Sequence, residues 1–115
     1  VSALHIAAGS GSLEALMILI EKGSKVDEAD SKGWRPLMVA AQDNRVDVEC
    51  IRALLTKGAN PDVKEKDGKT ALFIAAATGS FGALKILLQK GSKVDEATVK
   101  GWTALMAAAE KNNRD

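Results

Sequence analysis

The chain has 115 residues, of which 46% are hydrophobic and 27% are charged, a balance typical of a folded globular domain and not of a disordered segment. Its 16 basic and 15 acidic residues are spread along the sequence, which argues against binding to nucleic acid. No apolar run approaches the roughly 18 residues that a membrane-spanning helix needs, so we expect no membrane insertion.

Internal repetition dominates the sequence. Residues 23–29 (GSKVDEA) recur unchanged as residues 91–97, which is an offset of 68 residues. A shorter period lies inside this one, because four related segments begin at residues 2, 35, 70 and 103. The spacings of 33, 35 and 33 residues indicate a 33-residue repeat with a two-residue insertion in its second copy. We therefore divide the chain into repeats at residues 1–32, 33–67, 68–100 and 101–115, the last of them partial.

Each repeat is predicted to begin with a short helix. Ser2, Thr70 and Thr103 can cap the first turn by accepting a backbone N–H, and Pro36 suits the first helical position of the second repeat. The leucine, the apolar residue and the paired alanines that follow build one apolar face. The small alanine side chains permit close approach between neighbouring helices.

A second helix follows a Gly or Asn turn and is predicted over residues 13–22 in the first repeat and 81–90 in the third. Leu16, Leu19 and Ile20 mark its buried stripe. Each second helix ends in a Lys-Gly pair, at residues 22–23, 57–58 and 90–91. The glycine favours a left-handed end to the helix, and the lysine complements the helix dipole.

These features resemble ankyrin repeats across essentially the whole chain: a start like Thr-Pro-Leu-His, an Ala-Ala pair, and Leu-Leu before Lys-Gly. Only Pro36 occupies the proline position and only His5 the histidine position, which elsewhere holds Met38, Phe73 and Met106. The resemblance implies an all-α solenoid of stacked helix-turn-helix units, with hairpin-like loops projecting at residues 26–33 and 94–101. It also implies that His5 is a structural residue, hydrogen-bonded near the turn.

Repeats of this kind bury their faces against neighbouring repeats, and terminal repeats usually carry polar caps. This sequence has no such cap at either end. We therefore hypothesise that the native protein continues in both directions, with residues beyond 115 resembling residues 46–56.

The sequence predicts no catalytic residue, cofactor or metal site. The Gly-Ser run at residues 9–12 completes no phosphate-binding motif and lies at an inter-helix turn. His5 and Cys50 are each the single residue of their type. They lie in different repeats, so a catalytic His–Cys pair would require the two to meet, and a metal site would lack enough ligands of the usual types. Cys50 is interpreted as a small buried hydrophobic residue, with a redox-sensing role as the alternative. We expect no enzyme activity within this segment.

The resemblance further implies that a partner protein or peptide binds along the loop tips and the exposed side of each first helix. The positions that match are Ser31, Lys32, Trp34, Gln42, Asp43, Lys66, Asp67, Lys69, Ala77, Thr78, Val99, Lys100, Trp102, Glu110 and Lys111.

Two features of this row leave alternatives open. Trp34 and Trp102 either contact the partner directly or pack against adjacent loops. The lysines of the row are either suited to an acidic peptide or part of a solvated mixed-charge surface.

We interpret the chain first as a protein-interaction scaffold, monomeric and part of a larger protein. The alternatives are a regulatory or targeting arm of a larger enzyme or channel, and an architectural spacer. A single cysteine cannot form an internal disulfide, which favours an intracellular, cytoplasmic location.

Overall fold

The computed structural model describes residues 2–43, 45 and 48–114, with side chains described as far as residue 112. Within these residues the regular structure is helical throughout. The helices are α1 (Ala3–Ser10), α2 (Leu13–Glu21), α3 (Pro36–Gln42), α4 (Val48–Thr56), α5 (Ala71–Thr78), α6 (Phe81–Gln89) and α7 (Ala104–Arg114). The predicted all-α class is confirmed.

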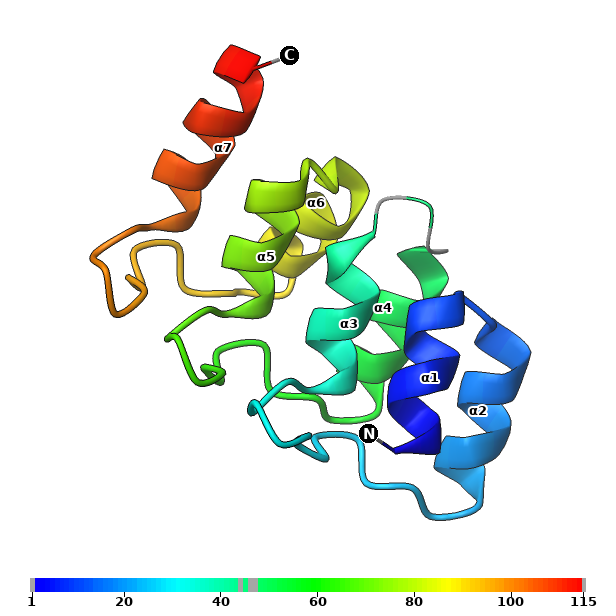
Figure 1. Cartoon of the computed structure of the whole chain (residues 1–115). Coiled ribbons are helices and arrows are strands. Elements are labelled where there is room, and N and C mark those ends of the chain that lie inside the picture. Colours follow the sequence, from blue (N-terminus) through cyan, green and yellow to red (C-terminus); the bar gives the residue numbers. More distant parts are fainter. Residues whose placement is uncertain (1, 44, 46–47, 115) are drawn as a thin grey trace.

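The helices form two rows (Figure 1). The first row runs α1, α3, α5, α7, each helix packed on the next, and the second row runs α2, α4, α6 behind it. The stack extends 41 × 24 × 22 Å. This arrangement is the predicted solenoid.

The helix ends follow the predicted signals. The Ser2, Thr70 and Thr103 hydroxyl oxygens accept the backbone N–H groups of the residues three positions later, at 3.2–3.3 Å. Pro36 is the first residue of α3. The second helices end one residue before their predicted lysine ends, and each following glycine, Gly23 among them, has a positive φ.

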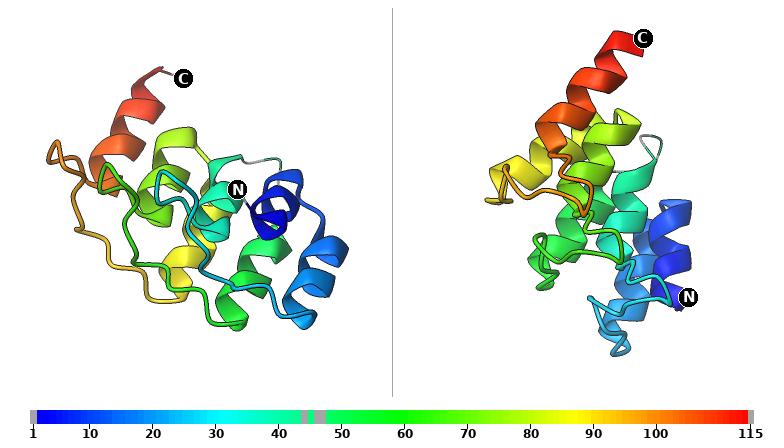
Figure 2. Two further views of the ribbon diagram at one scale, coloured as in Figure 1. Left: turned by 60° about the horizontal axis from the view of Figure 1, so that its bottom comes forward. Right: turned by 60° about the vertical axis from the view of Figure 1, so that its left-hand side comes forward.

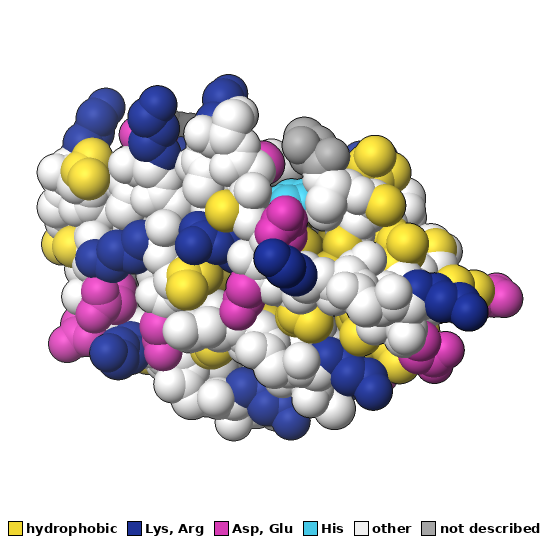
Figure 3. Space-filling model, turned by 90° about the horizontal axis from the view of Figure 1, so that it is seen from below, with side chains coloured by type: hydrophobic (Ala, Val, Ile, Leu, Met, Phe, Trp, Pro, Cys, Tyr) yellow, Lys and Arg dark blue, Asp and Glu magenta, His cyan; other side chains and the backbone are white. Residues whose placement is uncertain are grey.

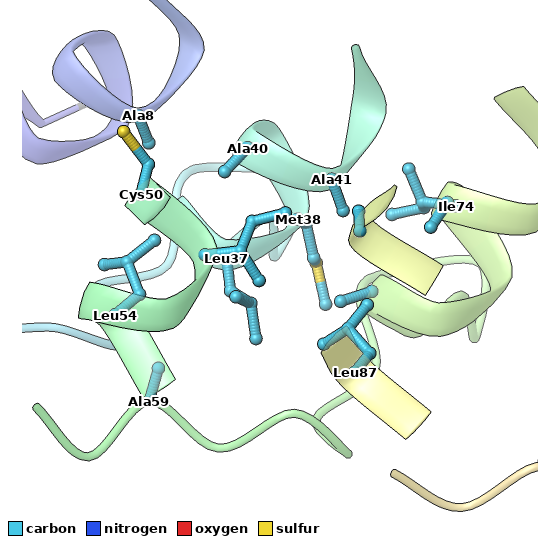
Figure 4. Close-up of a cluster of buried hydrophobic side chains, with 14 of the residues drawn as sticks. Ala8, Leu37, Met38, Ala40, Ala41, Cys50, Leu54, Ala59, Ile74 and Leu87 are labelled. Atoms are coloured by element: carbon cyan, nitrogen blue, oxygen red, sulfur yellow. The ribbon is translucent and has the colours of Figure 1, made fainter. Parts of the chain in front are cut away.

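Alanine and leucine side chains build the core between units. Leu4, Leu37 and Leu72 are at most 2% exposed. Cys50 is fully buried and lies beside Ala8, as predicted for a packing residue (Figure 4). In the predicted stripe of α2, Leu16 is fully buried, whereas Leu19 and Ile20 are only partly buried.

The extra residues of the second repeat lie between its two helices. Residues 43–47 separate α3 from α4, whereas residues 11–12 and 79–80 separate the helices of the first and third units. Residues beyond 115 were expected to resemble residues 46–56, and residue 46 lies outside the residues that the structure describes.

The described helices are all too short or too polar to cross a bilayer. Within the same residues, no cluster of three or more His, Cys, Asp or Glu is placed to hold a metal ion.

Candidate functional site: fingers and first-row helices

Three loops that precede α3, α5 and α7 project side by side from one end of the helices (Figure 2). We call residues 30–34, 65–69 and 98–102 the first, second and third finger. In each finger the N–H of the first residue donates to the carbonyl of the fifth, at 2.8–3.0 Å. The loops are therefore hairpin-like, as predicted.

A side-chain oxygen at the base of each finger holds its tip. Asp30 Oδ1 accepts the N–H groups of Lys32 and Trp34, both at 2.9 Å. Glu65 and Thr98 accept the two equivalent N–H groups in the second and third fingers. Three different side chains thus perform one structural task.

Neighbouring fingers are joined through their backbones. The Lys66 N–H donates to the Lys32 carbonyl at 3.0 Å, and the Val99 N–H donates to the Asp67 carbonyl at 2.9 Å. The fingers therefore form a continuous row, whose spacing is fixed by main-chain bonds.

His5 ties the first finger to α1. Its Nε2 lies 2.6 Å from the Trp34 carbonyl oxygen, and its Nδ1 lies 3.2 Å from the Ser2 backbone nitrogen. A carbonyl oxygen only accepts, so Nε2 carries the proton and Nδ1 accepts from Ser2. These hydrogen bonds confirm the predicted structural role of His5.

The electrostatics of the finger row follow from these bonds. Burial of the Asp30 carboxylate raises its pKa. The hydrogen bonds from the N–H groups of Trp34 and Lys32 lower the pKa, and the net result is a pKa of Asp30 below its ordinary value. At the end of α3, a hydrogen bond from Arg45 lowers the pKa of Asp43, and the two side chains are paired at 2.9 Å.

Two hollows lie where the third finger meets α5 and α7. The first, of about 220 Å³, is enclosed by Asp67, Lys69, Phe73, Thr98, Val99, Lys100 and Trp102. The second, of about 180 Å³, is enclosed by Phe73, Ala77, Trp102, Ala107, Glu110 and Lys111. Phe73 and Trp102 line both hollows.

The predicted partner-binding residues divide into two groups. The hollows bring together Asp67, Lys69, Ala77, Val99, Lys100, Trp102, Glu110 and Lys111. The other predicted residues line neither hollow: Ser31, Lys32, Trp34, Gln42, Asp43, Lys66 and Thr78. The Thr78 hydroxyl donates to the Ile74 carbonyl and is occupied within α5.

Sequence reasoning missed Phe73 as a site residue, because it assigned that position to the structural histidine of the repeat. The signal that could have found it was the replacement itself, since an aromatic ring without polar atoms cannot make the bonds that His5 makes. Phe73 is half-buried and its ring lines both hollows.

The two tryptophans differ in their surroundings. Trp34 is partly buried and packed against the core, whereas Trp102 is 39% exposed. The difference follows from the stack, because the second finger covers the first, and the described residues place no further finger beyond the third (Figure 2).

Charged side chains of both signs cover the finger end of the molecule (Figure 3). Basic and acidic side chains both lie there, and one pair joins two units: Lys64 Nζ and Glu96 Oε1 lie 3.0 Å apart, which lowers the pKa of Glu96. The surface around the hollows is therefore mixed in charge and not uniformly basic.

Paired helices stacked in two rows, with a finger before each new first-row helix, define a helical-repeat protein. Its row of fingers offers a surface for another polypeptide. The family model of ankyrin repeats (3 copies) matches residues 1–65 and 45–115. The chain belongs to the ankyrin-repeat family. Ankyrin repeats are protein-interaction modules, and they bind protein partners.

Relatives carry a similar segment in proteins of different kinds. The human ankyrin repeat and SOCS box protein 3 is 34% identical over 90% of this chain. A glycerophosphocholine phosphodiesterase of Schizosaccharomyces pombe is 37% identical over 78% of it, and a transient receptor potential cation channel subfamily A member 1 homolog of Caenorhabditis elegans is 31% identical over 99%. The chain spans 20%, 8% and 9% of the lengths of these proteins.

Proposed function

We propose that this segment binds a partner polypeptide along the finger row and the first-row helices, with the main contact at Phe73 and Trp102. The observation that carries the proposal is the position of these two rings, which line two open hollows. A large ring beside an open hollow is the usual centre of an interface that excludes water.

The chemistry of the hollows favours an apolar anchor with acidic flanks. Lys69 and Lys100 line the first hollow together with one acid, Asp67, and in the second Lys111 lies beside Glu110. Exposed pairs of this kind contribute little affinity, so the anchor supplies most of the binding energy and the charges select the partner. Trp34 is packed against the core and makes no direct contact with the partner in this proposal.

A peptide selection tests the proposal, because it does not require the natural partner to be identified first. A library of random peptides is enriched on the immobilised chain, and the Kd of an enriched peptide is measured by calorimetry. Trp102→Ala and Phe73→Ala should each weaken binding about thirtyfold or more, since anchors of an interface cost about 2 kcal/mol or more when truncated.

Trp34→Ala is the matched control, because it removes the same ring from the equivalent position of the first finger. It should change the Kd of the same peptide less than about threefold, after circular dichroism has shown that the variant is folded. Equal affinity of the wild type and of Trp102→Ala would refute the proposed contact.

A second candidate function is a regulatory or targeting arm of a larger enzyme or channel. The similarity to segments of a phosphodiesterase and of a channel homolog supports it. In either case we assign no catalytic step to this segment. The sequence of the entire parent protein separates the two candidates, because only the second requires an enzymatic or channel domain in the same chain.

A further inference from the structure

The larger of the two finger-row hollows, of about 220 Å³, lies between two neighbouring units. The second finger supplies Asp67 and Lys69 to its lining, α5 supplies Phe73, and the third finger supplies the other four residues. We call it the interfinger hollow. The two fingers that bound it stand next to each other in Figure 2, so the hollow belongs to the row itself.

Phe73 is the residue that sets the interfinger hollow apart from the rest of the row. His5 and Met38 occupy the same position in the first two repeats and are 2% and 1% exposed, whereas Phe73 is only partly buried. The next first-row helix packs against α1, α3 and α5 alike, so the difference does not come from the end of the stack. His5 is held by its bond to the Trp34 carbonyl, and the flexible Met38 adapts to the space around it. The rigid phenyl ring of Phe73 does neither and stays partly open to the hollow.

Aromatic rings and ammonium groups line the interfinger hollow together. Phe73 and Trp102 supply the rings, and Lys69 and Lys100 supply the ammonium groups, against the single carboxylate of Asp67. Within the part of the chain that the structure describes, the ion pairs include neither of these two lysines. Their charges are therefore available to a carboxylate that a partner brings.

The size of the interfinger hollow suits one ring. A cavity of about 150 Å³ inside a protein binds benzene, and this hollow measures about 220 Å³. A ring in it meets Phe73 and Trp102, and aromatic pairs attract each other beyond the apolar area that they bury. The two lysines add the attraction of an ammonium group for the face of a ring. An aliphatic side chain of the same volume gains neither contribution.

We propose that the interfinger hollow binds an aromatic side chain of the partner, and that Lys69 and Lys100 hold a carboxylate next to that ring. The ligand is thus a Phe or Trp residue beside an acidic residue in the partner's chain. This inference rests on the proposed function, because it specifies the anchor that the partner inserts between Phe73 and the third finger.

Three small probes test the interfinger hollow without the partner. They are 3-phenylpropanoate, 3-cyclohexylpropanoate, which has the same charge but no aromatic ring, and 3-phenylpropanamide, which has the ring but no charge. Each is titrated into the nitrogen-15-labelled chain, and the shift of the Trp102 indole N–H signal gives its Kd. The first probe should bind in the millimolar range, as expected for so small a ligand, and the other two at least about threefold more weakly.

Lysine variants test the carboxylate part of the proposal. The double variant Lys69→Met, Lys100→Met should bind 3-phenylpropanoate and 3-phenylpropanamide equally, because it keeps most of each aliphatic stem and deletes both charges. Lys66→Met is the matched control, since Lys66 is exposed in the second finger but lines neither hollow. It should keep the wild-type preference for the carboxylate.

Phe73→His tests the role of the phenyl ring with a variant that is expected to fold. Trp102 follows residue 73 by 29 positions, the same separation as between His5 and Trp34. The imidazole is therefore expected to donate to the Trp102 carbonyl and to be covered as His5 is. The affinity for 3-phenylpropanoate should fall at least about threefold, while the midpoint of thermal unfolding stays unchanged or rises.

Three results would overturn the proposal. One is binding of 3-cyclohexylpropanoate as tight as that of 3-phenylpropanoate, which would mean that the hollow selects apolar volume and not a ring. Another is equal affinity of the wild type for the acid and the amide, and the third is a Trp102 signal that no probe shifts. Failure of the proposed function is a separate result, because it appears as a selected peptide whose Kd is unaffected by Trp102→Ala.

Discussion

His5 links two repeats through one ring. Its Nδ1 accepts from the Ser2 N–H within α1, and its Nε2 donates to the Trp34 carbonyl 29 residues further along the chain. Phe73 at the equivalent position can make neither bond. The Met38 Sδ accepts the Arg35 N–H at 3.5 Å in place of the first bond, but a thioether cannot donate the second. The first finger is therefore attached to the helix stack by a hydrogen bond that the other units do without.

We expect His5→Leu to lower the free energy of unfolding by about 1–2 kcal/mol, because it removes a nearly buried hydrogen bond and half of the cap of α1. Urea unfolding followed by circular dichroism measures the change. Met106→Leu is the control at the equivalent position of the fourth repeat, and it should shift the same quantity by less than about 0.5 kcal/mol. Equal losses in the two variants would contradict the role of the ring.

The first finger is expected to be sensitive to acid. The pKa of Asp30 is lower in the folded chain than the value of about 3.9 in the unfolded chain. Its ionised form therefore stabilises the fold above that value, and the contribution is lost as the pH falls through the folded pKa. The carboxylate must be ionised to accept two N–H groups fully.

Asp30→Thr tests this sensitivity, because Thr98 makes the same two bonds in the third finger without a titratable group. Between about pH 6 and pH 3, the urea midpoint of the wild type should fall further than that of the variant. Other acids titrate equally in both proteins, so the difference between the two midpoints reports Asp30. A constant difference across this pH range would exclude the effect.

The close stacking of the fingers depends on glycine at the fourth position of the first and second fingers, Gly33 and Gly68. Gly68 has a φ of +81°, and a Cβ at this residue would lie 2.9 Å from the Val99 nitrogen in the third finger. Gly101 has the same φ, but a Cβ there would meet nothing within 4 Å. The two residues share the backbone strain and differ only in the neighbour.

Gly68→Ala should therefore destabilise the chain more than Gly101→Ala. The shared left-handed conformation costs each variant about 1–2 kcal/mol. The clash with the third finger should add about 1–3 kcal/mol in Gly68→Ala alone, since backbone must move. Thermal unfolding of both variants, compared with the wild type, gives the difference, and similar midpoints would mean that the fingers separate without cost.

At the scale of the whole molecule, the repeat and its local signals predicted the helix pairs correctly, and the resemblance to ankyrin repeats implied the fingers. Exposure was harder to predict, because it depends on which neighbour covers a residue. Trp34 and Trp102 occupy equivalent positions in near-identical segments, yet one is packed and the other borders two hollows. Phe73 was overlooked for a different reason, because its position was assigned to the structural histidine of the repeat.

The ends of the stack make this dependence measurable. Leu37 and Leu105 occupy the same position of the duplicated unit but are 1% and 78% exposed. Leu37→Ala should cost about 2–5 kcal/mol through lost burial and a cavity, whereas Leu105→Ala should cost less than about 0.5 kcal/mol. Urea unfolding of both variants measures the two losses. In a stack whose stability is a sum of nearest-neighbour terms, the two leucines differ because α4 and α5 both pack against α3, whereas α7 packs against α5 at the end of the described stack. A large loss in Leu105→Ala would show that the exposed end is already packed in solution.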